Sequence, residues 1–202
     1  MTKVTKDAYI IDGKHYVRVT KILDIIAKPE FFRWYAKNGY EFCENVKTVR
    51  AEFGTRVHKE IQNYLEGKDV WVDDDEMHKT MGLFSAWADS HSISPKHLEY
   101  HVRSDVYMYA GTVDFIGFFD GVFTIIDWKT SKKVYDNYFL QVAAYLAAFE
   151  EQHPDAERIQ ECRVVCFRDG KISSSLVKRE RALELFEYFK CARKLYEWKY
   201  GK

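Results

Sequence analysis

The chain lacks the features that mark secreted, membrane-spanning or disordered proteins. No apolar run approaches the roughly 20 residues that a transmembrane helix needs. The opening residues, MTKVTKDAYI, lack the apolar stretch of a signal peptide. Only three prolines occur, at positions 29, 95 and 154, and there is no Pro/Gly/Ser-rich linker. We therefore expect a cytoplasmic protein without a membrane partner, whose four cysteines are free thiols.

Net charge is also absent, because 31 basic and 31 acidic side chains balance. A protein coated uniformly in positive charge is thereby excluded. The charges are nevertheless uneven: the net charge is +4 over residues 1–50, −7 over residues 51–150 and +3 over residues 151–202. Carboxylates that bind a metal, framed by cations that bind phosphate, would give this pattern, and so would an ordinary solvated surface.

What the chain does have is enough apolar material for a core. Hydrophobic residues make up 47% of 202 residues and charged residues 31%, which is typical of one folded domain. We expect that domain to span residues 1–202. An N-terminal hairpin and helices would occupy residues 1–95, a catalytic sheet and helix residues 96–178, and a C-terminal helix residues 179–202.

Hydrophobic periodicity predicts the helices and strands. Two β-rich runs flank Asp12-Gly13, a favoured hairpin turn. Thr20 would cap a short helix that Pro29 closes, and further helices are predicted over residues 31–39, 43–66 and 74–90. Strands are predicted over 97–104, 107–119 and 122–130, then a helix over 137–150, a hairpin over 162–177 turning at Asp169-Gly170, and a helix over 181–200. This order predicts an α/β protein with a mixed sheet.

The hairpin between residues 111 and 133 carries the most informative charges. Asp114 lies on its first strand, and Asp127 and Lys129 lie two positions apart on its second strand. Because strand side chains alternate between faces, positions 127 and 129 should point the same way. Two carboxylates form a hard-oxygen site for Mg²⁺ or Mn²⁺, and a lysine can hold the attacking water and neutralise charge on phosphate. A surface ion pair would also give D-x-K, and the companion Asp114 favours the site.

Four blocks in order resemble one nuclease family. GTVD at 111–114, IIDWKTS at 125–131, LQVAAY at 140–145 and FGTRVHKEI at 53–61 resemble the motifs of the PD-(D/E)xK nuclease superfamily, in its RecB-like exonuclease branch. The opening HYVRVTKIL is also similar to phage-type members. The resemblance implies a restriction-endonuclease-like core, with a central mixed β-sheet flanked by helices and an added N-terminal helical region.

The same resemblance implies roles for individual residues. Asp114 and Asp127 would be metal-ligating carboxylates, joined by the backbone carbonyl of Trp128. Lys129 would be the catalytic lysine. His58 would ligate a metal in the catalytic centre, although a lone histidine on a helix can equally be a satisfied or solvent-facing residue.

Further residues would support the site or contact the substrate. Gln141 and Tyr145 share a helix face and would bind or orient phosphate, with Gln141 at the catalytic centre; Tyr145 could instead belong to the core. Glu99 would support the site, or be a surface glutamate. Candidate phosphate contacts beside the motifs are Arg56, Thr130 and Lys132.

The cysteines bear on a second cofactor that some RecB-like nucleases carry. One cysteine upstream and three downstream match an iron–sulfur cluster in number (Cys43, Cys162, Cys166 and Cys191). Cys162 and Cys166 lie in a predicted strand, which would separate them by about 13 Å. An iron–sulfur cluster is therefore not expected.

The resemblance implies a divalent-metal-dependent deoxyribonuclease with one or two Mg²⁺ or Mn²⁺ ions. It favours an exonuclease in DNA repair, recombination or phage DNA metabolism, acting in the host cytoplasm if phage-encoded. The expected partner is DNA that is single-stranded or has a free end, with a repair, recombination or packaging protein as a further candidate. Two alternatives stay open: a non-catalytic nucleic-acid-binding module of the same fold, and an endonuclease within a larger assembly.

Overall fold

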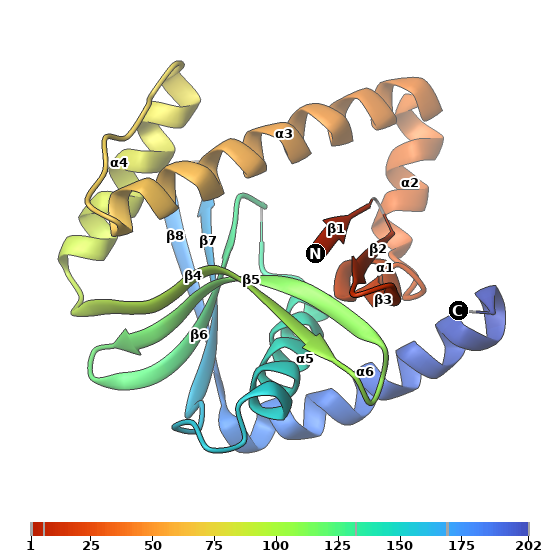
Figure 1. Ribbon diagram of the computed structural model, residues 1–202. Coiled ribbons are helices and arrows are strands. Elements are labelled where there is room, and N and C mark those ends of the chain that lie inside the picture. Colours follow the sequence, from red (N-terminus) through yellow and green to blue (C-terminus); the bar gives the residue numbers. More distant parts are fainter. Residues whose placement is uncertain (1, 6, 132, 169, 202) are drawn as a thin grey trace.

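The computed structural model describes residues 2–5, 7–131, 133–168 and 170–201, and one eight-stranded mixed sheet forms its centre. Helices α3 and α4 cover one face of the sheet, and α5 and α6 cover the other (Figure 1). The strands are β1 (Thr2–Val4), β2 (Ala8–Ile11), β3 (Lys14–Arg18), β4 (Ile93–Ser104), β5 (Tyr109–Phe119), β6 (Val122–Lys129), β7 (Glu161–Arg168) and β8 (Lys171–Lys178). The helices are α1 (Val19–Leu23), α2 (Pro29–Asn38), α3 (Tyr40–Leu65), α4 (Asp75–Asp89), α5 (Asp136–Gln152) and α6 (Arg179–Tyr200). The helix-flanked mixed sheet expected from the sequence is thus confirmed.

Strand β5 is the junction of the sheet. The strand order is β1-β2-β3-β5-β6-β7-β8, and β4 pairs with β5 outside this path. Contacts β3–β5 and β6–β7 are parallel, and the others are antiparallel. One edge of β5 pairs with β4, while the other pairs with β3 at Tyr109 and Ala110 and with β6 only from Phe115 onward. Strands β5 and β6 therefore separate before residue 115, next to the GTVD motif.

The side chains of β4 and β5 switch between the two faces of the sheet at one residue pair, and we call this switch the changeover. The rung Leu98–Phe115 packs into the core under α3 and α4, whereas the rung Tyr100–Val113 packs into the core on the α5 side. Rungs two residues apart ordinarily share a face. The changeover occurs between them, where Glu99 has a φ of +48°.

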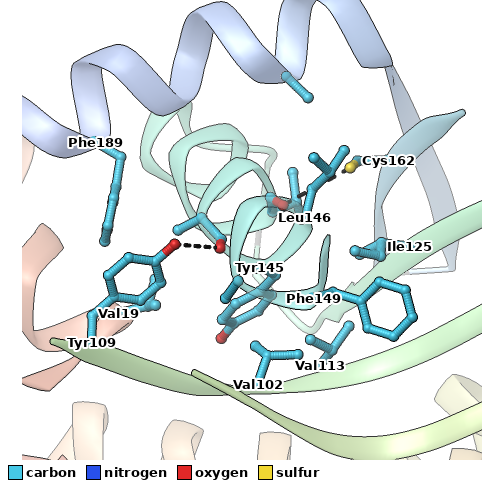
Figure 2. Packing of buried hydrophobic residues seen from close by; sticks show 14 of the residues in the cluster. Val19, Val102, Tyr109, Val113, Ile125, Tyr145, Leu146, Phe149, Cys162 and Phe189 are labelled. Atoms are coloured by element: carbon cyan, nitrogen blue, oxygen red, sulfur yellow. Dashed lines mark hydrogen bonds between the residues drawn. The ribbon is translucent and has the colours of Figure 1, made fainter. Parts of the chain in front are cut away.

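Each face of the sheet buries its own core. On one side α5 lies between the sheet and α6, and Figure 2 shows Tyr145 and Phe149 of α5 directed at Val113 and Ile125 of the sheet. The hydroxyl of Tyr109 donates a 2.9 Å hydrogen bond to the Ala144 carbonyl, which ties β5 to α5. On the other side an aromatic cluster joins α4 to β6 and β7, namely Phe84, Trp87, Trp128 and Phe167. The GTVD and IIDWKTS motifs lie at the boundary between these two cores.

Most of the predicted elements are present, with local differences. The Asp12-Gly13 and Asp120-Gly121 turns have positive φ at both residues, as a two-residue hairpin requires. The turn residue Asp169 lies outside the described residues, although β7 and β8 pair as predicted. The prediction for Thr20 was wrong, because α1 begins at Val19 and no side chain caps it.

Pro29 also has a different place from the one predicted. It starts α2 and does not close the preceding helix, which ends at Leu23. The fixed φ of proline and its missing N–H suit the first turn of a helix, where the N–H would have no intrahelical partner. Within the described residues, no helix is long and apolar enough to span a membrane.

A substitution at Gly111 tests whether α5 must approach β5 closely. A Cβ atom at this position would lie 2.3 Å from Cε1 of Tyr145. We expect Gly111→Ala to displace the Tyr145 ring and to lower the free energy of unfolding by about 1–3 kcal/mol, as overpacked cores do. Urea denaturation measures the change.

Gly82→Ala is the matched control, since nothing lies within 4 Å of a Cβ atom at this position on α4. It should leave stability unchanged or raise it by up to about 1 kcal/mol, because alanine favours helix. Equal stability of Gly111→Ala and wild type would show that the close approach to Tyr145 is not needed.

Candidate active site

His58 reaches the sheet from α3. This helix buries Phe53, Val57 and Ile61 against the sheet, which leaves the adjacent His58 half-buried at the rim of that core. His58 Nδ1 lies 3.3 Å from Asp114 Oδ1 and 3.9 Å from Glu99 Oε1. The helix therefore places an imidazole next to two carboxylates of the sheet.

Glu99 and Asp114 face each other across β4 and β5. The flanking rungs, Leu98–Phe115 and Tyr100–Val113, place them opposite one another. Together with His58 they offer ligand atoms that all lie within 4.8 Å of one another. Opposed like charges destabilise a strand pair, and a glutamate at positive φ is uncommon, so two local costs coincide at this rung. Such costs gather at functional sites.

Asp114 lies in the gap where β5 and β6 separate. Its Oδ2 accepts a 2.7 Å hydrogen bond from the backbone N–H of Trp128, and only 7% of the residue is exposed. A side chain thereby takes the position that a ladder bond between the two strands would otherwise fill. The N–H and C=O of one strand residue point to the same edge, so the Trp128 carbonyl faces this gap as well.

Asp127 and Lys129 point the same way, as their spacing predicts. Asp127 Oδ2 lies 2.6 Å from Lys129 Nζ, and Oδ1 accepts a 3.0 Å hydrogen bond from Gln141 Nε2 on α5. Gln141 Nε2 also donates to the hydroxyl of Tyr145 at 2.9 Å. Tyr145 is buried, so it holds Gln141 in place from within the core.

The aromatic ring of Tyr138 contacts the lysine. Lys129 Nζ lies 4.9 Å from the ring centroid, within the range of a cation–π interaction. Tyr138 is not among the residues that the motifs predicted. Its signal was its spacing, because Tyr138, Gln141 and Tyr145 recur at i, i+3 and i+7 on one helix face.

His58 and Asp114 form an ion pair at neutral pH. Burial alone would lower the pKa of His58, but the charge and hydrogen bond of Asp114 outweigh it and raise the pKa to about 9. Burial also opposes ionisation of Asp114, whose pKa is nevertheless lowered overall by His58. The imidazole is therefore mostly protonated in the metal-free protein at pH 7.

The other two carboxyl groups are shifted in the opposite direction. Burial raises the pKa of Glu99 to about 7, with a further contribution from the Asp114 charge. Burial likewise raises the pKa of Asp127 to about 6 against the attraction of Lys129. The pKa of Lys129 is raised as well, since Asp127 and Asp114 outweigh burial. With all three carboxyl groups ionised, the site holds three negative charges against the two positive charges of His58 and Lys129.

The donor set fits a hard divalent cation. Carboxylate oxygens and an imidazole suit Mg²⁺ or Mn²⁺, and ligand carboxylates must be ionised to bind. Asp127 Oδ2 is buried and, despite its short contact with Lys129, lacks an aligned hydrogen-bond donor among the described residues. A cation would satisfy this oxygen and relieve the excess negative charge.

The remaining candidate residues differ in which parts of the chain they contact. Thr130 follows Lys129 and packs against α3, where a Cβ at Gly54 would lie 3.4 Å from its Oγ1. Arg56 forms ion pairs with Asp73 and Asp74 instead of facing the carboxylates. Lys132 lies outside the described residues. The cysteines are free thiols, with Cys43, Cys162 and Cys166 buried and Cys191 exposed.

The raised pKa of Glu99 predicts a pH-dependent effect on stability. Its protonated form stabilises the fold below the ordinary pKa of 4.5, and this contribution is lost as the pH rises through about 7. In EDTA, Glu99→Gln should therefore melt above wild type at pH 8, and the difference should vanish near pH 4. About 1 kcal/mol shifts the Tm of a chain this size by roughly 2–4 °C, so calorimetry can resolve the effect.

Glu66→Gln provides a control of opposite sign. A hydrogen bond from Lys68 holds the pKa of Glu66 below its ordinary value, so its ionised form is the stabilised one. This variant should not gain in Tm as the pH rises. A Glu99→Gln variant that melts below wild type at pH 8 would contradict the charge excess inferred for the site.

Comparison with curated proteins finds similarity to a protein named as an exonuclease. No protein-family model matches the chain. The chain is 29% identical over 174 residues to mitochondrial genome maintenance exonuclease 1 of Mus musculus, a match that covers 75% of this chain and 50% of the mouse protein. The chain thus spans about half the length of this curated relative. Among solved structures, an inferred exonuclease from Eubacterium rectale has 12% identity and a TM-score of 0.49, covering 73% of this chain and 68% of the other.

Proposed function

We propose that the chain is a divalent-metal-dependent deoxyribonuclease that hydrolyses phosphodiester bonds. The observation that carries the proposal is the convergence of an imidazole from α3 with carboxylates and a lysine from β4, β5 and β6. The 29% identity to a protein named as an exonuclease supports the same chemistry. A structural ion-pair network would not need a second carboxyl group with a raised pKa, that of Glu99, opposite Asp114.

The metal would be held by the carboxylates of Asp114 and Asp127, by His58 and by the Trp128 carbonyl, and Glu99 would complete or support the set. When bound, a divalent cation polarises the phosphodiester, lowers the pKa of a water and stabilises the departing oxygen. His58 would lose its proton on binding, since only the neutral imidazole is a ligand.

Lys129 acts as an ammonium group in this scheme. Its raised pKa keeps it protonated at neutral pH, so it does not serve as a general base while it pairs with Asp127. It would donate hydrogen bonds to the attacking water and to the phosphate as charge develops there. Water adds to phosphorus, the bond to the 3′-oxygen breaks, and that oxygen takes up a proton, which leaves a 5′-phosphate product.

Gln141 would orient Asp127, since its amide donates a hydrogen bond to Oδ1 and another to the hydroxyl of Tyr145.

We favour an exonuclease acting on DNA that is single-stranded or has a free end, in repair, recombination or phage DNA metabolism. A partner protein of that pathway and one or two Mg²⁺ or Mn²⁺ ions belong to the same proposal.

End-labelled DNA tests the activity. With Mg²⁺ or Mn²⁺, wild type should degrade at least one of a panel of single- and double-stranded oligonucleotides, and should leave closed circular single strands intact. Lys129→Ala should lower the rate by at least about 10²–10³-fold, as loss of one charge-stabilising donor does elsewhere. Lys194→Ala, on the exposed face of α6, is the matched control and should keep the wild-type rate.

An inactive wild type on every DNA form, or a fully active Lys129→Ala variant, would refute the nuclease proposal. Cleavage of the closed circle would contradict the exonuclease assignment alone.

Metal binding can be measured without DNA. Isothermal titration with Mn²⁺ should show binding to wild type, with protons released as His58 becomes a ligand. Asp114→Asn should weaken binding by at least about tenfold, because a carboxylate ligand is lost. Lys129→Ala, which removes a cation beside Asp127, should bind Mn²⁺ at least as tightly as wild type. Unchanged affinity in Asp114→Asn would place the metal elsewhere.

A further inference from the structure

A chain of hydrogen bonds runs from the N-terminal hairpin to the edge of the candidate site. The hydroxyl of Tyr9 on β2 lies 2.8 Å from Thr112 Oγ1 on β5, and the same oxygen lies 3.0 Å from His101 Nδ1 on β4. Tyr9 is 2% exposed, whereas His101 is exposed to solvent. A buried phenol is thus connected through one hydroxyl to a surface imidazole.

Donor satisfaction fixes the direction of this chain. The Tyr9 hydroxyl has Thr112 as its hydrogen-bond partner, and a buried O–H that fails to donate is costly. Tyr9 therefore donates to Thr112, and among the hydrogen bonds of the described residues Nδ1 of His101 is the acceptor that the single Thr112 proton can reach. Nδ1 accepts, so a neutral His101 carries its proton on Nε2. An N–H donor is thereby presented to solvent in a fixed orientation.

The position of His101 relates this donor to the candidate site. His101 lies opposite Thr112 in the β4–β5 ladder. Each is two residues from one of the opposed carboxylates, His101 from Glu99 and Thr112 from Asp114, which corresponds to about 7 Å along a strand. Past the changeover in the pleat, Ala110 and Thr112 contact the N-terminal hairpin through Tyr9. The donor therefore lies on the hairpin side of the sheet, next to the carboxylates.

One guanidinium group contacts the same tyrosine as His101. The guanidinium of Arg18 lies 5.7 Å from the centroid of the Tyr9 ring, whereas that of Arg103, 5.9 Å from the Tyr16 ring, is paired with Asp105. The ring of His101 contacts Tyr9 edge-on at 5.6 Å, which restrains it further. Arg18 and His101 thus contact the same ring, and an N–H donor in the neighbourhood of a guanidinium group suits an anion with hydrogen-bond-accepting oxygens.

We propose that His101 forms a phosphate subsite, which binds a phosphate of the nucleic-acid strand adjacent to the scissile one. The inference rests on the proposed function, since it takes a DNA strand as the ligand. Thr112 and Tyr9 are positioning residues that fix the tautomer and orientation of His101. The subsite holds the strand in register while the adjacent linkage lies at the carboxylates.

The tautomer can be tested without any substrate. Long-range ¹H–¹⁵N correlation spectra, assigned with His101→Gln, should show the Nε2–H tautomer of His101 when the imidazole is neutral. Thr112→Val, which keeps the side-chain shape and removes the hydroxyl, should produce a mixture of tautomers. A wild-type His101 protonated on Nδ1 would overturn the proposal regardless of enzymatic activity.

The ligand is tested by binding in the Lys129→Ala background, in which cleavage is expected to be at least about 10²-fold slower. Fluorescence anisotropy with a labelled single-stranded oligonucleotide should show about tenfold weaker binding on adding His101→Ala, the size expected for a hydrogen bond to a charged group. Thr112→Val should weaken binding severalfold. His78→Ala, an exposed histidine on α4, is the matched control and should bind like the background.

A scan with one neutral methylphosphonate linkage identifies the contact. At one linkage, the substitution should weaken binding with His101 present and have no further effect in His101→Ala. Equal affinity with and without His101 overturns the subsite and leaves the nuclease intact. Failure of the wild-type chain both to bind and to cleave DNA overturns the subsite together with the proposed function.

Discussion

The hydrogen bond from the Trp128 backbone N–H to the Asp114 carboxylate is the contact on which the rest of the site depends. Strands β5 and β6 are paired as far as Phe115 and Ile126 and then separate. The carboxylate bridges the two strands where they part, so their backbones stay close without forming a ladder. Asp114 Oδ1 is left to face His58, and the Trp128 carbonyl faces the same gap.

The arrangement is costly, and the two cores on either side of it offset the cost. Glu99 adopts a positive φ, two carboxylates oppose each other, and a lysine and an aspartate are withdrawn from water. The aromatic cluster around Trp128 and the packing of Tyr145 and Phe149 under the sheet hold the backbone that carries these groups. Stability is concentrated in the cores, and the strain at the boundary where the ionisable groups meet.

Sequence periodicity accounts for much of this fold. Asp-Gly pairs predict two hairpins that the structure contains. The alternation of side chains along β6 places Asp127 and Lys129 on one face, where they form an ion pair. The changeover of the pleat at Glu99 has no such signal, because LEYHV is an ordinary strand pattern. It coincides with the point where β5 and β6 separate, a feature that involves three strands together. Glu99 lies there with His58 and Asp114, whereas the resemblance had implied only a supporting role for it.

The contacts of Arg56 could not be predicted from its motif. Its place beside the histidine motif suggested a phosphate contact, but its side chain projects toward Asp73 and Asp74, before α4. Local sequence identifies residues that share a motif, whereas the partner of a long side chain depends on which segment packs beside it. Tyr138 was overlooked for the same reason, since its contact with Lys129 joins α5 to β6.

Groups from α3, β5 and β6 are proposed to bind a divalent cation between them. Anomalous diffraction from crystals grown with Mn²⁺ can locate this cation. We expect a manganese peak bonded to carboxylate oxygens of Asp114 and Asp127 and to a ring nitrogen of His58. Ordered density for all three side chains, with no manganese between them at saturating Mn²⁺, would contradict it.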